Sequence, residues 1–346
     1  MLLKKFKNNK IYYYFLKTLI IPIYSTFWTL VLNLYAFLVG VLYQIKTINI
    51  KSINFENNSK KLVKDNGKFI EIANLINKSI SKELIEREVK EIKSEEHKKN
   101  MKAKNEAMAL NPYVANLFSK LDLNTRKQII NFATSDLLVK TACNYLGVYP
   151  MLARIYVNLN IPASENARSS QLWHRDDFGY KNLDLFLAIN EINDDNGPLS
   201  VLKKKDPLKV FYRIKNEINS GLTGERGKIL DKDFNYLDSQ NKDQIIKLEG
   251  KSGTGLWLDS IRNYHKGGHC KSNYRIILRI NYMTSDSTFD LESLNEERKY
   301  WYEILDKKDK NSFFTKNLFK QRPKVISTFK IPQYLFKLYH ILSIKN

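Results

Sequence analysis

The sequence predicts a mainly β protein, a sandwich or jelly roll of short strands with helical segments before and after it. Two patterns support this prediction. Between residues 146 and 285 the apolar residues occur in short runs rich in Val, Ile, Leu and Tyr, bounded by Gly, Pro, Asn and Asp. Such runs, without helices between them, are typical of antiparallel sheets. Residues 51–145 and 286–346 instead show stretches with helical spacing in a polar background.

The N-terminal segment, residues 1–50, is basic and hydrophobic. Residues 18–45 contain no Asp, Glu, Lys, Arg or His and lie between Lys17 and Lys46. A transmembrane helix needs roughly 20 mainly apolar residues, so the stretch is long enough to enter a membrane. Lysines flank it on both sides, which gives little asymmetry for the positive-inside rule and favours a helix lying in the plane of the membrane. The sequence therefore predicts attachment to the cytoplasmic side of a membrane, with a buried helix packed on the core as the alternative.

The next region, residues 51–145, is predicted to be helical and to pack on the β core. Residues 79–109 place Ile and Leu at helical spacing among Lys and Glu, as in an amphipathic helix. Residues 124–145 also show a helical pattern, which Gly147 and Pro150 end. The last stretch, from residue 326, is basic and aromatic and fits either a membrane surface or an ordinary C-terminal helix.

The composition excludes some classes of function. The chain has 57 Lys and Arg against 36 Asp and Glu, a formal net charge of +21. Such an excess is found in proteins that bind nucleic acid or anionic lipid, and also where lysines are spread over a whole surface. Neither zinc-finger spacing nor an RNP-like aromatic strand is present, so we expect no nucleic-acid partner. Cys143 and Cys270 cannot form a disulfide framework, which favours a reducing compartment.

A metal site is predicted from the segment QLWHRDDFGY, residues 171–180. Side chains alternate along an extended strand, so His174 and Asp176 point to one face while Asp177 points away. A second segment, residues 253–282, supplies another histidine and arginines on the strand that follows it. Two histidines and one carboxylate on one face of Fe(II) leave three coordination positions open, as in non-heme oxygenases. In such a site 2-oxoglutarate takes two positions, and its far carboxylate requires a fixed cation such as a guanidinium.

Two pairings with the same spacing compete for the second half of the site. His265 lies ten residues before Arg275, and His269 lies ten residues before Arg279. Both arginines share one strand face, so either could reach the co-substrate. We favour His265 as the third metal ligand and Arg275 as the anchor of 2-oxoglutarate.

The chain resembles the phytanoyl-CoA dioxygenase family of Fe(II)/2-oxoglutarate oxygenases over roughly Tyr145 to Tyr282. The motifs that carry the resemblance are LWHRDDFG, LFLAINEINDDNGPLSVL, and Leu-Asp-Ser…Tyr-His-Lys-Gly followed by Tyr-Arg-Ile-Ile-Leu. It implies a double-stranded β-helix, iron held by His174, Asp176 and His265, and 2-oxoglutarate anchored by Arg275. Members of the family often continue from NGPL into Pro-Gly-Ser-His, whereas this chain reads SVLKKKDP, so the namesake substrate does not carry over.

The function expected from these features is hydroxylation of an unidentified substrate, a small molecule that could be membrane-borne or lipid-linked. Asp176 favours hydroxylation over halogenation, because halogenases of this fold lack the carboxylate ligand. Gln171 is predicted to lie on the same face as His174 in a regular strand and to hydrogen-bond the co-substrate. Two alternatives stay open: a non-catalytic, membrane-attached jelly-roll binding module that retains these residues, and a cupin-like site for another metal. Arg275 argues against the cupin, which needs no carboxylate anchor there.

Overall fold

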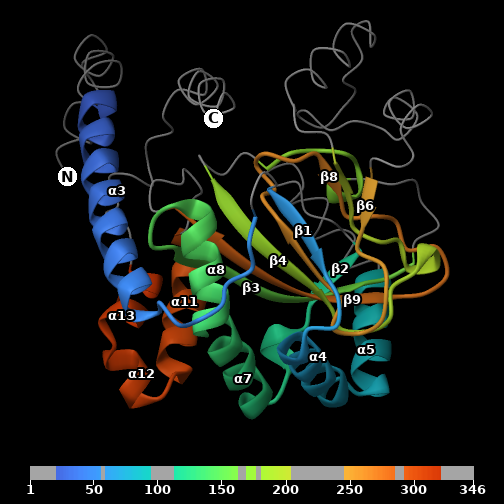
Figure 1. The fold of residues 1–346 in the computed structure, drawn as a ribbon. Coiled ribbons are helices and arrows are strands. Elements are labelled where there is room, and N and C mark those ends of the chain that lie inside the picture. The colour runs from blue at the N-terminus through green and yellow to red at the C-terminus, as the bar shows by residue number, and fades with distance from the viewer. Residues whose placement is uncertain are drawn as a thin grey trace, which may run out of the picture.

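The computed structural model describes residues 21–55, 59–94, 113–162, 169–176, 181–203, 245–284 and 292–320. Two antiparallel sheets form the centre of this part of the chain, with helices below and beside the larger one (Figure 1). The larger sheet has the strand order β1 (Lys60–Val63), β7 (Gly255–Leu258), β4 (Asn182–Ala188), β9 (Arg275–Met283), β3 (Met151–Asn160), β2 (Val114–Asn116). The smaller sheet has the order β6 (Ile245–Lys247), β5 (Ser200–Leu202), β8 (His265–Lys266). The predicted combination of antiparallel sheets and helices is confirmed.

Alternation along the long strands separates two environments. Leu185 on β4 and Leu278 on β9 point to the outer face of the larger sheet and join the main hydrophobic core. Their neighbours Asp184 and Arg279 point to the inner face, where they form an ion pair. This period of two is what a pleated strand imposes, and it places these two charged side chains on the inner face.

Helices bury the outer face of the larger sheet. The helices that contribute buried residues to this core include α4 (Gly67–Ser79), α5 (Lys82–Lys93), α7 (Leu123–Ala133) and α8 (Asp136–Leu146). Their first turns are fixed locally, because the side chains of Asn66, Ser81 and Asp122 accept backbone N–H groups as N-caps. The predicted helix over residues 124–145 is two helices, since the chain turns at Thr134 and Ser135 before α8 begins.

A second, smaller core lies between the two sheets. It joins the inner faces of β4, β7 and β9 to β5 and its flanking residues, through Phe186, Ala188, Ile192, Leu199, Val201, Leu248, Leu256, Leu258 and Ile277. All of these side chains are buried. This apolar contact holds the smaller sheet against one part of the larger sheet and leaves the polar part of the inner face free for a site.

Two strands of the larger sheet lie in the region predicted to be helical. The short strands β1 and β2 each pair with a long neighbour, β7 and β3. The segment KKLV in β1 has no alternation that a sequence pattern could detect, because its pairing with β7 and not its own composition places it in the sheet. The predicted boundaries of the four regions stay predictions.

The remaining helices are α3 (Ile21–Lys46), α11 (Glu292–Ile304), α12 (Lys307–Asn311) and α13 (Phe313–Phe319). One side of α3 rests on the rest of the protein: the Tyr43 hydroxyl donates to Asp136 Oδ1 at 2.7 Å, and the Ala36 carbonyl accepts the Tyr149 N–H at 2.8 Å. In the part of the chain that the structure describes, no helix combines the length and the apolar character needed to cross a membrane. Attachment through residues 18–45 stays a prediction; residues 18–20 and the predicted C-terminal stretch beyond residue 320 lie outside the described residues.

Candidate metal centre

Three of the predicted residues converge on one point at the open side of the sheets. One ligand atom each from His174, Asp176 and His265 lies within 4.8 Å of the others, close enough for all three to bind one metal ion. Backbone pairing causes this convergence: His174 and His265 exchange N–H···O bonds of 2.9 Å in an antiparallel bridge. Asp176 follows two residues later, and its N–H donates to the Ser260 carbonyl at 2.9 Å.

Both imidazoles are oriented by hydrogen bonds to backbone carbonyls. His174 Nδ1 lies 2.7 Å from the Leu172 oxygen, and His265 Nδ1 lies 3.1 Å from the Asn263 oxygen. A carbonyl only accepts, so Nδ1 carries the proton in each ring and Nε2 keeps its lone pair. This is the arrangement that fixes metal-binding histidines. His174 Nε2 lies 3.6 Å from Asp176 Oδ1, which places a nitrogen and an oxygen ligand side by side.

The second oxygen of Asp176 is already occupied. Asp176 Oδ2 accepts the Ser260 hydroxyl at 2.8 Å and Arg279 Nη2 at 3.3 Å. Oδ1 is therefore the oxygen directed at the metal position. Burial by itself would raise the pKa of Asp176, but the neighbouring His265 and Arg279 outweigh burial and hold that pKa well below its usual range.

A buried carboxylate on β4 supports Asp176 from behind. Asp184 accepts four hydrogen bonds: from Arg279 Nε at 2.8 Å, Asn281 Nδ2 at 2.9 Å, Ser260 Oγ at 2.9 Å and Asn182 Nδ2 at 3.1 Å. Two of these donors also contact Asp176: Arg279, and the Ser260 hydroxyl, whose single proton is shared between the two carboxylates. Asp184 thus fixes the groups that orient a metal ligand, a role that sequence reasoning missed. Its inward place in the alternating run LDLFLAI was the available signal.

The turn between β7 and β8 positions His265, the third candidate ligand. Asp259, fully buried at the end of β7, accepts the Tyr145 hydroxyl at 2.6 Å and the backbone N–H groups of Ile261 and Arg262, both at 3.1 Å. Burial raises the pKa of Asp259 to about 6 despite these donors. The same turn ends at Asn263, whose carbonyl orients His265.

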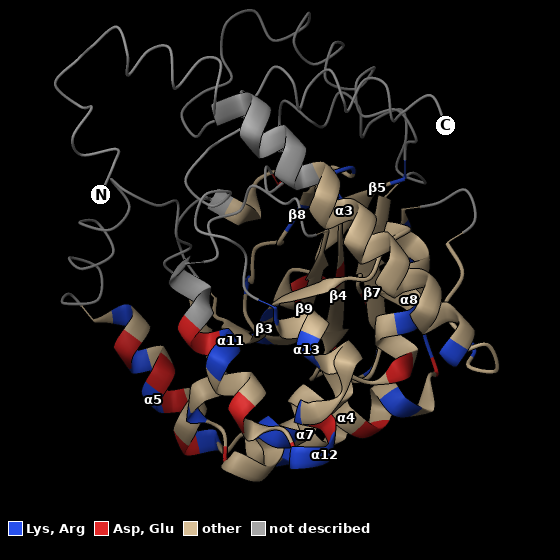
Figure 2. Cartoon of the chain, turned by 90° about the vertical axis from the view of Figure 1, so that its left-hand side faces the viewer, with Lys and Arg blue, Asp and Glu red and all other residues tan. Residues whose placement is uncertain are grey.

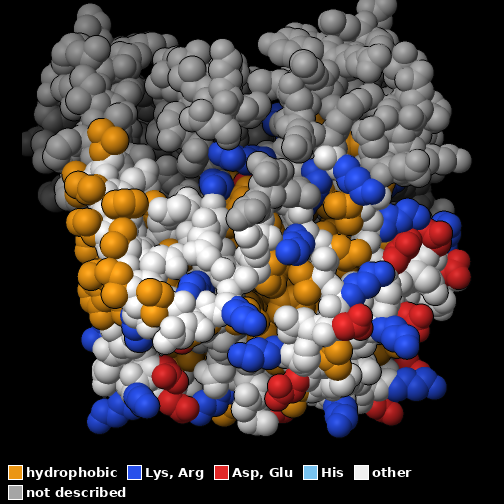
Figure 3. Space-filling view, viewed as in Figure 1, with side chains coloured by type: hydrophobic (Ala, Val, Ile, Leu, Met, Phe, Trp, Pro, Cys, Tyr) orange, Lys and Arg blue, Asp and Glu red, His pale blue; other side chains and the backbone are white. Residues whose placement is uncertain are grey.

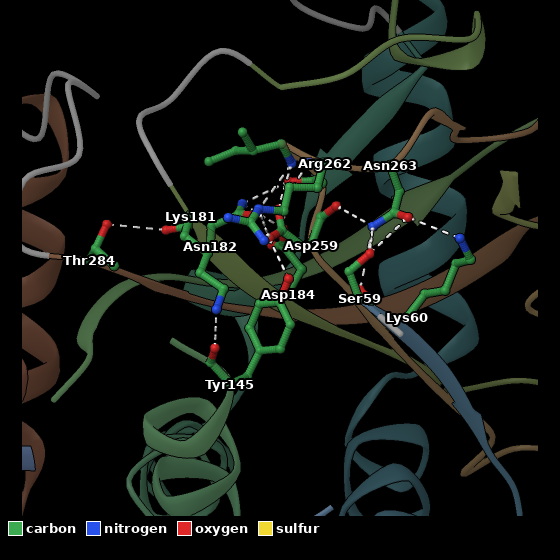
Figure 4. A network of polar contacts seen from close by, with 12 residues as sticks. Ser59, Lys60, Tyr145, Lys181, Asn182, Asp184, Asp259, Arg262, Asn263 and Thr284 are labelled. Carbon is green, nitrogen blue, oxygen red and sulfur yellow. Dashed lines mark hydrogen bonds and ion pairs between the residues drawn. The ribbon is translucent and has the colours of Figure 1, made fainter. Parts of the chain in front are cut away.

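The edge strand β1, which pairs directly with β7, reaches the same turn. Asn263 donates through Nδ2 to Ser59 Oγ at 2.6 Å and to the Asp259 carbonyl at 2.8 Å, and its Oδ1 accepts Lys60 Nζ at 3.0 Å (Figure 4). Burial lowers the pKa of Lys60 to about 8. These bonds show how a short edge strand, far away in sequence, contributes to the placement of His265.

The two arginines that sequence could not distinguish have different surroundings. Arg279 is committed to Asp184 and Asp176 and also lies over the Phe186 ring. Arg275 is buried, and no acceptor among the described residues bonds its Nε or Nη1. Burial lowers the pKa of Arg275, although nearby Cys270 partly offsets that effect. A buried guanidinium with unused donors is costly unless a ligand supplies the acceptor. This observation favours Arg275 as the anchor.

Other predicted residues have different outcomes. The structure brings His265, and not His269, to the pair formed by His174 and Asp176.

The regular strand predicted through Gln171 is wrong, because Gln171 ends the 3-10 helix η3 (Ser169–Gln171). An odd spacing of three residues would in any case turn Gln171 away from His174 in a strand. Its predicted bond to the co-substrate stays a prediction.

Large aromatic side chains near the site fill the core. Trp257 points to the outer face of the sheet and is fully buried in the main core. Trp173 is buried beside the site, and Lys266 Nζ lies 5.1 Å from the centre of its ring. Asp177, His97 and His340 lie outside the described residues.

Among the comparisons with known proteins, only the comparison with solved structures found similar proteins. No protein-family model and no curated protein sequence matches the chain. The structure of EctD from S. alaskensis with 2-oxoglutarate and 5-hydroxyectoine has a TM-score of 0.40 at 13% identity, over 68% of this chain and 75% of EctD. EctD with bound Fe has a TM-score of 0.38 at 14% identity, over 80% of this chain and 82% of EctD. The alpha-ketoglutarate-dependent epimerase SnoN from nogalamycin biosynthesis has a TM-score of 0.37 at 12% identity, over 68% of this chain and 81% of SnoN. Likeness at this level assigns no family.

The support of Asp176 by Ser260 leads to a first prediction. Ser260→Ala removes the one hydroxyl proton that Asp176 and Asp184 share, while Arg279 still holds both carboxylates. Loss of a group that orients a metal ligand typically weakens metal binding by about 10- to 100-fold. We expect a loss of that size in titrations with Fe(II) or Co(II), with the melting temperature little changed. Metal affinity equal to that of wild type would show that Arg279 alone orients the carboxylate.

Proposed function

We propose that the protein is an Fe(II)/2-oxoglutarate-dependent dioxygenase that hydroxylates its substrate, built on a double-stranded β-helix. The observation that carries this proposal is the convergence of His174, Asp176 and His265 on the same inner sheet face as a buried arginine with unused donors, Arg275. Two imidazoles and one carboxylate are the ligand set of the non-heme Fe(II) oxygenases. The motifs that resemble the phytanoyl-CoA dioxygenase family support the same proposal.

The residues of the site fit the groups that the proposal requires. His174 Nε2, His265 Nε2 and Asp176 Oδ1 would hold the metal, and Arg275 would bind the far carboxylate of 2-oxoglutarate through two parallel N–H bonds. Iron and 2-oxoglutarate, when bound, would activate O2, which is the oxidant for hydroxylation of an unactivated C–H bond; 2-oxoglutarate would be converted to succinate and CO2. The protein contributes orientation: the Leu172 and Asn263 carbonyls hold the rings, and Asp184 holds the two donors that fix Asp176.

The presence of a carboxylate ligand supports hydroxylation over halogenation, because a halide would need the position that Asp176 takes. The substrate remains a proposal of class only, a small molecule that could be membrane-borne or lipid-linked. A non-catalytic binding module is the competing proposal. Succinate release separates the two, because a binding module with the same residues would bind iron and 2-oxoglutarate without consuming them.

A second prediction tests the proposed function at Arg275. Purified protein with Fe(II), ascorbate and 2-oxoglutarate is expected to release succinate, and Arg275→Lys is expected to raise the KM for 2-oxoglutarate by roughly 10- to 100-fold. An ammonium group keeps the charge but loses one of two charge-assisted hydrogen bonds, each worth about 1.5–3 kcal/mol. The effect on kcat should be smaller, because Arg275 is remote from the reacting bond.

The matched control is Arg126→Lys on α7, an arginine that bonds the Tyr300 hydroxyl away from the site. It should leave the KM unchanged. Absence of succinate from wild-type protein that binds Fe(II) and 2-oxoglutarate would leave the binding module as the better proposal. A normal KM in Arg275→Lys, with a raised KM in Arg279→Lys, would reverse the assignment of the two arginines.

A further inference from the structure

From Leu30 to Ile45, the side of α3 that faces away from the other described residues is apolar. We call this surface the α3 face; it consists of Leu30, Val31, Leu34, Tyr35, Phe37, Leu38, Val41, Leu42, Ile45 and, just beyond the helix, Ile48. Leu34 is 61% exposed, Leu42 54% and Ile45 67%. Figure 3 shows the side chains as one continuous apolar column along one edge of the molecule. Contiguous exposed apolar surface of this kind marks an interaction site in folded proteins.

The exposure of the α3 face does not come from loose attachment of the helix. The opposite side of α3 belongs to the main core through Val39 and Tyr43. Gly40 lets the backbones approach so closely that an added Cβ would lie 3.0 Å from the Tyr149 nitrogen. A helix that is apolar all round is ordinarily buried all round. Here the described residues cover one side only, so we look for a partner for the second side.

Charge indicates the kind of partner. Neither α3 nor α13 contains an Asp or Glu, and in Figure 2 the coloured part of the α3 ribbon has no red (Asp or Glu) position, whereas other helices have several. Lysines border the α3 face on the side of α13. Lys320 Nζ lies 4.2 Å from the centre of the Tyr35 ring, and Lys46 Nζ lies 4.9 Å from that of Phe314. Phe313, 49% exposed, adds an aromatic ring on α13.

We infer that the α3 face docks on an anionic phospholipid bilayer, with the helix lying in the plane of the membrane. Apolar side chains would enter the boundary of the acyl chains, and the bordering lysines would contact lipid phosphates. Helices that lie in the membrane interface place their apolar and basic side chains in this way. The helical part of the strip, from residue 30 to residue 46, is about 24 Å long at 1.5 Å per residue. Its other side stays packed on α8 and α13, so docking requires no rearrangement of the core.

The inference is independent of the proposed oxygenase activity, because vesicle binding needs neither iron nor 2-oxoglutarate. A cytoplasmic membrane surface would suit that activity, since 2-oxoglutarate and reduced iron are cytoplasmic resources. The charge of the chain, +21, adds a general attraction to anionic surfaces. The experiment must therefore separate the α3 face from overall charge.

A third prediction makes this separation with two matched substitutions. Full-length protein is expected to sediment with vesicles of phosphatidylcholine and phosphatidylserine, and less with phosphatidylcholine alone. Leu34→Glu should weaken binding at least about tenfold, because it removes a side chain worth about 1.5 kcal/mol in lipid and adds a negative charge. Leu123→Glu adds the same charge at a leucine that is 59% exposed on α7, and it should bind nearly as well as wild type.

Three outcomes would overturn the inference. Equal losses in Leu34→Glu and Leu123→Glu would mean that net charge alone drives binding. A concentration-dependent dimer that Leu34→Glu dissociates, without vesicle binding by wild type, would make a second copy the occupant. A thiol in Leu34→Cys that is protected from labelling in monomeric protein without vesicles would mean that another segment of this chain covers the face. Buried Cys143 and Cys270 serve as unreactive references in that measurement.

Discussion

In the Asp176→Ala variant, iron-dependent decarboxylation of 2-oxoglutarate should fall below detection. The substitution removes the negatively charged ligand and leaves two neutral imidazoles, which hold Fe(II) poorly. The fold should survive, because Arg279 keeps its pair with Asp184 and Ser260 keeps its bond to the same carboxylate. We therefore expect a near-normal melting temperature together with loss of Fe(II) binding in the Asp176→Ala variant.

The histidines allow a matched comparison within one turn of the chain. His265→Ala should behave as Asp176→Ala does, because His265 belongs to the converging group and His269 does not. His269→Ala should keep at least about a tenth of the turnover, the limit expected of a residue that binds no metal. Titration with Co(II), followed by its absorption, reports ligation without turnover. Full activity in His265→Ala together with inactivity in His269→Ala would reverse the ligand assignment, and unchanged turnover in Asp176→Ala would remove the proposed activity.

The parts of the site that the sequence predicted are those that depend on local geometry. The spacing of His174 and Asp176 requires only that the chain be extended for three residues. The choice between His265 and His269 needed more, because it depends on a turn held by Asp259. Sequence could name Asp259 as context but could not show that Tyr145 and Asn263 hold the turn together.

The support of the site could not be predicted because it is non-local. Asp184 meets Arg279 across the pairing of β4 with β9, and Ser260 joins them from the end of β7. Each residue alone fits an ordinary strand or turn. The edge strand β1 is a similar case, since its placement comes from its partner β7. The sequence predicted helical structure over residues 124–145 but missed the turn at Thr134 that separates α7 from α8. A short turn between two helices hardly disturbs the spacing of the apolar residues.

The inner face of β9 also gives a prediction on stability, in which two arginines on one strand have opposite effects. Arg279→Met leaves the carboxylates of Asp184 and Asp176 without their cation, and removal of one partner from a buried ion pair typically costs about 3–5 kcal/mol. Arg275→Met removes a buried guanidinium whose Nε and Nη1 bond no described residue, and it supplies an apolar side chain of similar length. The free energy of unfolding should then stay the same or rise, since the cost of desolvating an unpaired charge is gone.

Urea unfolding of protein without metal or 2-oxoglutarate measures the free energy of unfolding of both variants under the same conditions. The expected order of stability is Arg275→Met equal to or above wild type, with Arg279→Met well below both. Adding Asp184→Asn to Arg279→Met should recover part of the loss, because the orphaned carboxylate is then neutral. Saturating 2-oxoglutarate with Fe(II) should stabilise wild type and not Arg275→Met, because a ligand stabilises only the state that binds it. If Arg275→Met were less stable than wild type in the absence of ligand, Arg275 would be a residue that stabilises the fold. The stability that wild type gives up by burying Arg275, whose Nε and Nη1 bond no described residue, is on this argument the cost of keeping a cation ready for the co-substrate.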